Sequence, residues 1–181
     1  MMRLNQQDFE FARKELLDSY KCKQSFRVAI GKTTWIPYET FNPSYNLREI
    51  LNDEVVIEFD TDRETSLMAT HLTGINLYKA NIVFQVWDHD GRSPHIHIYD
   101  LPIADLEPDK KALFKKLFIR KYVPQEYIKF VDMSLTNVHL VRLEYSPCWK
   151  GKFDVKKLLY EFNPIKNANE AKMFSIEPEK T

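Results

Sequence analysis

The sequence predicts an α+β protein in which a mixed or antiparallel sheet is covered by helices mainly on one face. Three observations lead to this prediction. Apolar residues recur at helical spacing in three segments, β-branched and aromatic residues crowd five shorter segments, and an Asp90-Gly91 pair typical of tight hairpin turns separates two of these. At 181 residues the chain can bury a real core, and we expect a single domain over residues 1–181.

The three helical segments are expected at residues 6–20, 64–78 and 109–122, the last ending before Pro124. Each places apolar residues three or four positions apart, so that they line one face of a helix. The expected stripes are Phe9, Ala12, Leu16 and Tyr20; Leu67, Met68, Leu72 and Ile75; and Leu113, Phe114, Leu117 and Phe118.

The strand segments alternate with these helices, which favours an RRM-like core within the α+β sheet. Residues 31–47 carry Gly31, Pro37 and Pro43 and are expected to be irregular, and the polar tail over 164–181 is expected to pack loosely. Strands are expected at 54–60, 81–87, 94–99, 128–132 and 138–145, with a strand or short helix at 153–162.

Composition narrows the function classes. The formal net charge is zero, so a polyanionic partner would have to be held by local basic patches or through metal ions. Cys22 and Cys148 form no CxxC pair, which indicates a reducing, cytoplasmic setting and no disulfide framework. We expect no secretory signal and no membrane span, because no apolar run is long enough.

Residues 54–63, EVVIEFDTDR, combine an apolar strand with acids near its end. Side chains alternate along a strand, so Glu58 and Asp60 share a face about 7 Å apart at the backbone. Two such carboxylates repel each other, and a pair of divalent cations of the kind used in phosphoryl transfer would relieve the repulsion. The alternative is a solvent-facing acidic edge on a half-buried strand.

Residues 91–100, GRSPHIHIYD, place His95 and His97 on one face of a strand. Two imidazoles so placed can bind metal, or one can bind a phosphate while the other orients it. Arg92 and Ser93 just before them add a guanidinium and a hydroxyl, which suit a phosphate cradle. The alternative is one satisfied buried histidine and one exposed histidine.

Residues 130–147, FVDMSLTNVHLVRLEYSP, hold a third candidate acid, Asp132, at an expected strand end, and Arg142 within an apolar run. Taken alone, Asp132 could cap a turn, and Arg142 could pair with Glu144 or another acid. The segment becomes informative beside the other two.

The three segments, in this order, resemble the archaeo-eukaryotic primase superfamily of primase small subunits, primase-polymerases and plasmid replicases. EVVIEFDTD is similar to its first motif, a strand that ends in two carboxylates one residue apart. GRSPHIHI is similar to the second, a small residue and a His on the next hairpin. VDMSLTNVHLVRLEY is similar to the third, an apolar residue and Asp followed by His139, Leu140 and Arg142. The resemblance spans residues 54–146.

This resemblance implies a two-metal nucleotidyltransferase. Glu58, Asp60 and Asp132 would bind two Mg²⁺ or Mn²⁺ ions and act as the catalytic acids. The incoming nucleoside triphosphate would be held by Arg92, Ser93, His95 and Arg142, with His97 and His139 as supporting residues. The chain departs from the family in having Glu58 where Asp is usual and Ser93-Pro94 where a Gly-aromatic pair is common. No zinc-binding insertion lies between the motifs, so no zinc site is expected.

A single-stranded DNA template would need a basic surface, and the 109–121 helix offers Lys111, Lys115 and Arg120, mostly opposite its expected apolar stripe. The alternative for this helix is a solvated face. Trp87, Tyr145 and Trp149 could stack on bases, although core packing is an equal alternative for Trp87. The resemblance also implies a larger primase subunit or a helicase as a partner.

Three functions therefore compete. The first is a metal-dependent primase or primase-polymerase. The second is a primase-like accessory subunit that binds nucleotide or template without chemistry. The third is an HUH-type single-strand endonuclease, in which His95 and His97 bind one metal and Tyr122 or Tyr127 is the nucleophile.

Overall fold

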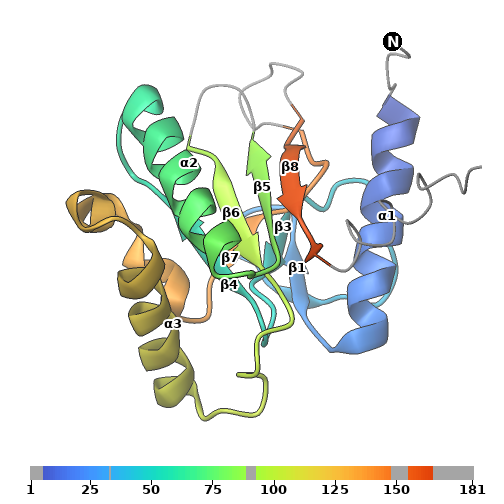
Figure 1. Ribbon diagram of the computed structural model, residues 1–181. Helices are drawn as coiled ribbons and strands as arrows, with labels where there is room; N and C mark the ends of the chain where they lie inside the picture. The colour runs from blue at the N-terminus through green and yellow to red at the C-terminus, as the bar shows by residue number, and fades with distance from the viewer. Residues whose placement is uncertain (1–5, 33, 89–92, 148–154, 165–181) are drawn as a thin grey trace, which may run out of the picture.

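The computed structural model describes residues 6–32, 34–88, 93–147 and 155–164, and it confirms the α+β class (Figure 1). Arg92, the Asp90-Gly91 turn, Trp149 and the tail beyond Pro164 lie outside the described residues. The described helices are α1 (Gln6–Lys23), α2 (Arg63–Lys79) and α3 (Pro108–Tyr122), with 3₁₀ helices η1 (Gln125–Phe130) and η2 (Met133–Thr136). The described strands are β1 (Arg27–Ala29), β2 (Ile36–Pro37), β3 (Leu47–Glu49), β4 (Val55–Glu58), β5 (Phe84–Asp88), β6 (His95–Ile98), β7 (Leu140–Arg142) and β8 (Lys157–Phe162).

The strands form two antiparallel sheets where the sequence suggested one. The first sheet has the order β2-β1-β3-β7 and the second has the order β4-β6-β5-β8. In Figure 1, α2 and α3 lie on one side of the second sheet, and α1 lies on the far side of the molecule. The side chains of α1 pack with those of the first sheet, as Leu17 and Tyr20 do with Val28.

The register of β4 and β6 separates an apolar face of the second sheet from a polar one. Val55 pairs with Ile98 and Ile57 with Ile96, and these four side chains join the main core beneath α2 and α3. The residues that alternate with these four along the two strands, including Glu58, His95 and His97, point to the other face because strand side chains alternate. We expected that polar face to be open. It is instead covered by the first sheet, so that Val56 packs with Val141 of β7.

Helix α2 begins where Asp62 accepts a hydrogen bond from the Thr65 amide at 2.9 Å, as an N-cap does. Its buried face is built from small residues: Ser66, Ala69, Thr70, Thr73 and Gly74, together with Leu77. The expected stripe was therefore wrong, since Leu67 and Met68 are exposed. Small residues bring the helix close to the sheet, and a Cβ on Gly74 would lie 3.2 Å from the Tyr160 hydroxyl.

Helix α3 follows the prediction in its bounds and in part in its buried face, which is formed by Lys115, Phe118 and Ile119, with Phe114 packed against the main core. Leu113 and Leu117 of the expected stripe are exposed. The strand expected at 128–132 is also wrong. Its residues up to Phe130 continue the 3₁₀ helix η1, and only Val131 makes a β-bridge, with Phe59.

Candidate functional site

The bridge between Phe59 and Val131 brings the three predicted acids together. Two backbone hydrogen bonds flank it, from the Asp60 amide to the Phe130 carbonyl at 2.7 Å and from the Asp132 amide to the Glu58 carbonyl at 2.9 Å. This antiparallel pairing sets Asp132 directly opposite Glu58, where Cα atoms are typically about 5.5 Å apart.

By the alternation of side chains along paired strands, the three carboxylates are expected on one face of this short pairing. Opposed residues share a face, and so do residues two apart in a strand, so Asp132 lies beside Glu58 and Asp60 follows next along the strand. Phe59 and Val131 point the other way, into the main core. The bridge thus brings the backbone of the three acids together although about 70 residues separate them in the chain.

The side chains around these acids already have partners. His95, opposite Glu58 in β6, places its Nε2 atom 3.2 Å from the Glu58 carboxylate. Asp132 caps η2 by accepting a hydrogen bond from the Ser134 amide at 2.9 Å. The Ser93 hydroxyl, which we expected beside the nucleotide, donates to the Phe59 carbonyl. Asp60 is exposed. Within the described ranges, no group of three or more His, Cys, Asp or Glu side chains is arranged to hold a metal ion.

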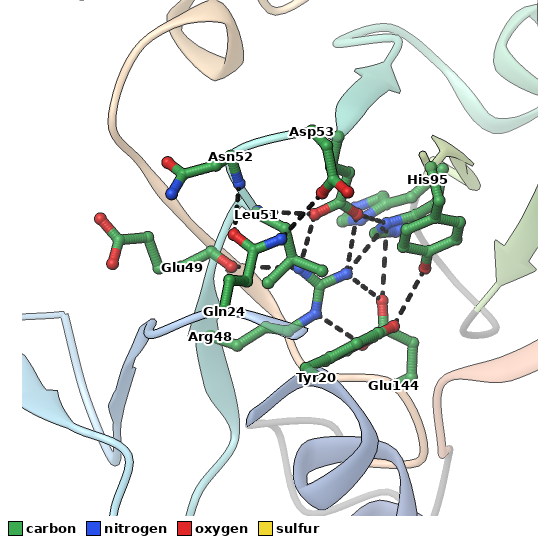
Figure 2. A network of polar contacts seen from close by, with 12 residues as sticks. Tyr20, Gln24, Arg48, Glu49, Leu51, Asn52, Asp53, His95 and Glu144 are labelled. Atoms are coloured by element: carbon green, nitrogen blue, oxygen red, sulfur yellow. Dashed lines mark hydrogen bonds and ion pairs between the residues drawn. The ribbon is translucent and has the colours of Figure 1, made fainter. Parts of the chain in front are cut away.

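Behind the acids, a buried cluster of charged side chains fills the space between the sheets (Figure 2). Its centre is Arg48 of β3, which lies fully buried and forms a bidentate pair with Glu54, at 2.7 and 2.8 Å. The same guanidinium binds both oxygens of Glu144, at 2.9 and 2.8 Å. Tyr20 of α1 covers this cation with its ring. The ions therefore compensate each other out of contact with water.

A chain of hydrogen bonds links this cluster to Glu58. His97 Nδ1 lies 2.6 Å from Glu54, so it donates to that carboxylate, and His97 Nε2 then accepts from Lys156 Nζ at 3.1 Å. Lys156 also donates to His95 Nδ1 at 3.3 Å, which leaves His95 Nε2 as the donor to Glu58. The Lys156 ammonium makes a third hydrogen bond, to the Arg142 carbonyl oxygen at 2.7 Å. The tautomers of both histidines follow from their neighbours.

The environment shifts the pKa values of these groups in a consistent pattern. Burial, followed by the charge of Lys156, lowers the pKa of His97 to about 4 and also lowers the pKa of His95. Burial would raise the pKa of Glu54, but Arg48 overcomes this and holds it at about 2. Burial lowers the pKa of Lys156 to about 8, against the opposing effect of Glu144. Both imidazoles are therefore neutral at pH 7.

The other predicted binding residues make contacts of their own in the fold. Arg142 of β7 donates to the Pro147 carbonyl at 2.9 Å, and its own carbonyl receives Lys156. His139 precedes β7, where its carbonyl accepts from the Ile50 amide. Trp87 is buried and packs edge-on against Tyr145, so core packing is the role that the structure gives it.

The basic helix does not share a face with the acids, because α3 packs on the apolar face of the second sheet. Arg120 is exposed and Lys111 is partly exposed, whereas Lys115, one helical turn after Lys111, is buried. The template surface expected from these three residues is therefore not a continuous one.

The geometry around the two histidines does not favour the endonuclease alternative. Lys156 Nζ contacts a ring nitrogen of each histidine, in the place where a shared metal would have to bind. Tyr122 and Tyr127 pack against the main core, on the opposite face of the sheet. Neither tyrosine faces the histidines.

Sequence reasoning missed Arg48, Glu54 and Lys156, the buried charged residues whose hydrogen bonds lead to His95 and Glu58. The signal available for Arg48 and Glu54 was a charged residue next to a short apolar run, as in LREIL and EVVI. Glu144 was noticed only as a possible partner of Arg142, whereas it pairs with Arg48. Nothing in the local pattern marks Lys156.

No protein-family model matches the chain, and a search of curated proteins finds no significant match. The resemblance to primases therefore depends on the three motifs, and it stays a prediction. Among the described residues, no helix is both long enough and apolar enough to cross a membrane.

Proposed function

We propose that this protein is a primase-type nucleotidyltransferase that joins nucleoside triphosphates on a single-stranded template. The observation that supports the proposal is the backbone pairing of residues 58–60 with 130–132, which sets Asp132 opposite Glu58 and brings Asp60 next along the strand. The order of the motifs in the chain points to the same reaction.

The donor set fits hard divalent cations, which prefer carboxylate oxygens. When bound, two Mg²⁺ or Mn²⁺ ions about 4 Å apart would stabilise the attacking and leaving oxygens of phosphoryl transfer. Asp60 is exposed, so that a substrate can approach it, while Glu58 is half-buried and contacts His95. Asp132 is fixed by its cap on η2, so that its carboxylate keeps one orientation.

The buried chain of hydrogen bonds supplies the rigidity that such a site requires. Lys156 fixes His95 as a donor toward Glu58, and His97 and Glu54 anchor Lys156 from the other side. A misplacement of about 1 Å can reduce a rate roughly a hundredfold, so a carboxylate held by a fixed donor is of direct use in catalysis.

The test is template-directed synthesis with purified protein, labelled nucleoside triphosphates, a single-stranded DNA template, and Mg²⁺ or Mn²⁺. Asp60→Asn and Asp132→Asn should each abolish primer synthesis and primer extension while the protein stays folded. Asn caps a helix about as well as Asp, so the Asp132 variant keeps η2 intact. The matched control is Asp105→Asn, which neutralises an exposed acid between β6 and α3.

Product that persists undiminished in both site variants would refute the proposal. So would the absence of product from the unmodified protein with either metal, with or without an added primase partner. The control variant should match the unmodified protein under every condition.

One observation favours a second candidate, the non-catalytic accessory subunit. Glu58 and Asp132 already have partners in the described structure, and no metal-binding group is found among the described residues. This candidate predicts nucleotide or template binding without synthesis, together with a gain in the activity of a partner primase on mixing. Equilibrium dialysis with labelled nucleotide and a mixing assay distinguish the two.

A further inference from the structure

A buried lysine on α3 has no hydrogen-bond or ion-pair partner among the described residues. The side chain of Lys115 is 4% exposed, yet no described residue accepts a hydrogen bond from its ammonium or forms an ion pair with it. The two acids whose charges raise the pKa of Lys115 are otherwise engaged: Glu54 is bound by Arg48, and Asp53 accepts from Gln24 at 2.9 Å. The residue is largely shielded, but its ammonium is not among the fully enclosed unpaired polar atoms, so it reaches solvent and is open to an anion.

Lys115 lines a pocket of about 380 Å³ between α3 and the first sheet. The first turn of α3 forms one wall, and the segment after η2, with Asn137, forms another. Glu107, the N-cap residue of α3, makes no side-chain hydrogen bond to the first-turn amides. The pocket therefore combines the ammonium of a largely buried lysine with the uncapped amide end of a helix, and both attract anions.

The neighbouring charges favour a ligand that carries two negative charges. Lys111 lines the same pocket, and its charge helps burial to lower the pKa of Lys115 to about 8. A dianion would offset both ammonium groups. Of the two acids that line the pocket, Glu49 is neutralised by Arg27 at 2.5 Å, and Asp109 is exposed in the first turn of α3.

We propose that this pocket binds the phosphate group of a small phosphate ester, with Lys115 as its principal ligand. Inorganic phosphate would leave most of the volume unfilled, whereas a nucleoside monophosphate or the 5′-phosphate end of a nucleic acid would occupy more of it. The pocket lies at the N-terminal end of α3 and contains none of the three acids, so its role does not depend on the nucleotidyltransferase site.

The test is titration of the isotope-labelled protein with inorganic phosphate, then with AMP, then with a 5′-phosphorylated tetranucleotide, followed by backbone amide NMR. The amides of the first turn of α3 and of Asn137 should shift. Lys115→Met keeps the apolar stem and removes the charge, so it should weaken binding by about tenfold or more. The matched control is Lys116→Met, an exposed neighbour on the same helix, which should leave the affinity unchanged.

The three probes distinguish the sources of the phosphate, since tighter binding of AMP or of the tetranucleotide identifies the ester that fills the pocket. If Lys115→Met does not fold, Lys111→Met serves in its place and should also weaken binding. The proposal is overturned if no probe shifts these amides, if succinate binds as tightly as phosphate, or if the lysine variants bind with unchanged affinity.

Discussion

Acid should destabilise this protein through His97, and the size of the effect follows from the structure. The imidazole is fully buried, donates to Glu54 and accepts from Lys156, so it is neutral in the folded state. Protonation would place a second cation against the Lys156 ammonium. The perturbation is a fall in pH from 7 to 5, compared between the unmodified protein and His97→Gln, which keeps a donor and an acceptor but cannot titrate.

The pKa of His97 is lowered from 6.5 to about 4 in the folded protein. Between these two values the unfolded chain binds more protons than the folded one, so stability falls as the pH falls. From pH 7 to pH 5, this histidine should remove about 2 kcal/mol from the free energy of unfolding. Glu54 contributes little to the loss of stability between pH 7 and pH 5, because its pKa of about 2 in the folded protein and its ordinary pKa of 4.5 both lie below pH 5.

Urea unfolding measured by circular dichroism at pH 7, 6 and 5 gives the required free energies. The loss between pH 7 and pH 5 should be smaller by about 2 kcal/mol in His97→Gln than in the unmodified protein. His71→Gln, an exposed histidine on α2, is the control and should keep the full loss. Equal losses of unfolding free energy in the unmodified protein and in His97→Gln would refute the conclusion that the His97 imidazole is buried in its neutral form.

Two further predictions concern the charges themselves. Arg48→Met should destabilise the fold by about 3–5 kcal/mol in urea unfolding, because it leaves two buried glutamates uncompensated. Arg27 forms a partly exposed ion pair with Glu49, so Arg27→Met should lower the free energy of unfolding by less than about 1 kcal/mol. Similar losses of stability in Arg48→Met and Arg27→Met would contradict the account. Glu58→Asp, which restores the acid usual in the resembled family, should keep primer synthesis within about a hundredfold of the unmodified rate. Glu58→Gln should abolish it, and equal rates for the two Glu58 variants would exclude this carboxylate as a metal ligand.

The sequence was sufficient to place Glu58 and Asp60, because strand alternation puts residues two apart on one face whatever the surrounding fold. It was also sufficient for the approximate bounds of the helices, where periodic apolar residues mark each segment and Pro124 marks an end. The position of Asp132 came from the motif resemblance. The strand expected around it is mostly a 3₁₀ helix, and its single bridge to Phe59 leaves no periodic pattern.

Local pattern could not reveal the buried charges. Arg48 and Glu144 are 96 residues apart, and the spacing within each segment says nothing of the other. The apolar stripes were misjudged for a related reason. Small residues of α2 are buried because the sheet approaches them closely, while Leu113 and Leu117 of α3 face away from it. Burial of this kind depends on the partner element, which periodicity does not specify.

The central claim is that Glu58, Asp60 and Asp132 together bind the metals of a nucleotidyl transfer reaction. Its most direct test is a crystal of the protein soaked with a nucleoside triphosphate and Mn²⁺, examined by anomalous diffraction. The account predicts two manganese peaks about 4 Å apart that contact these three carboxylates and the triphosphate. Nucleotide bound with no manganese at the three acids, or manganese bound only elsewhere, would contradict it.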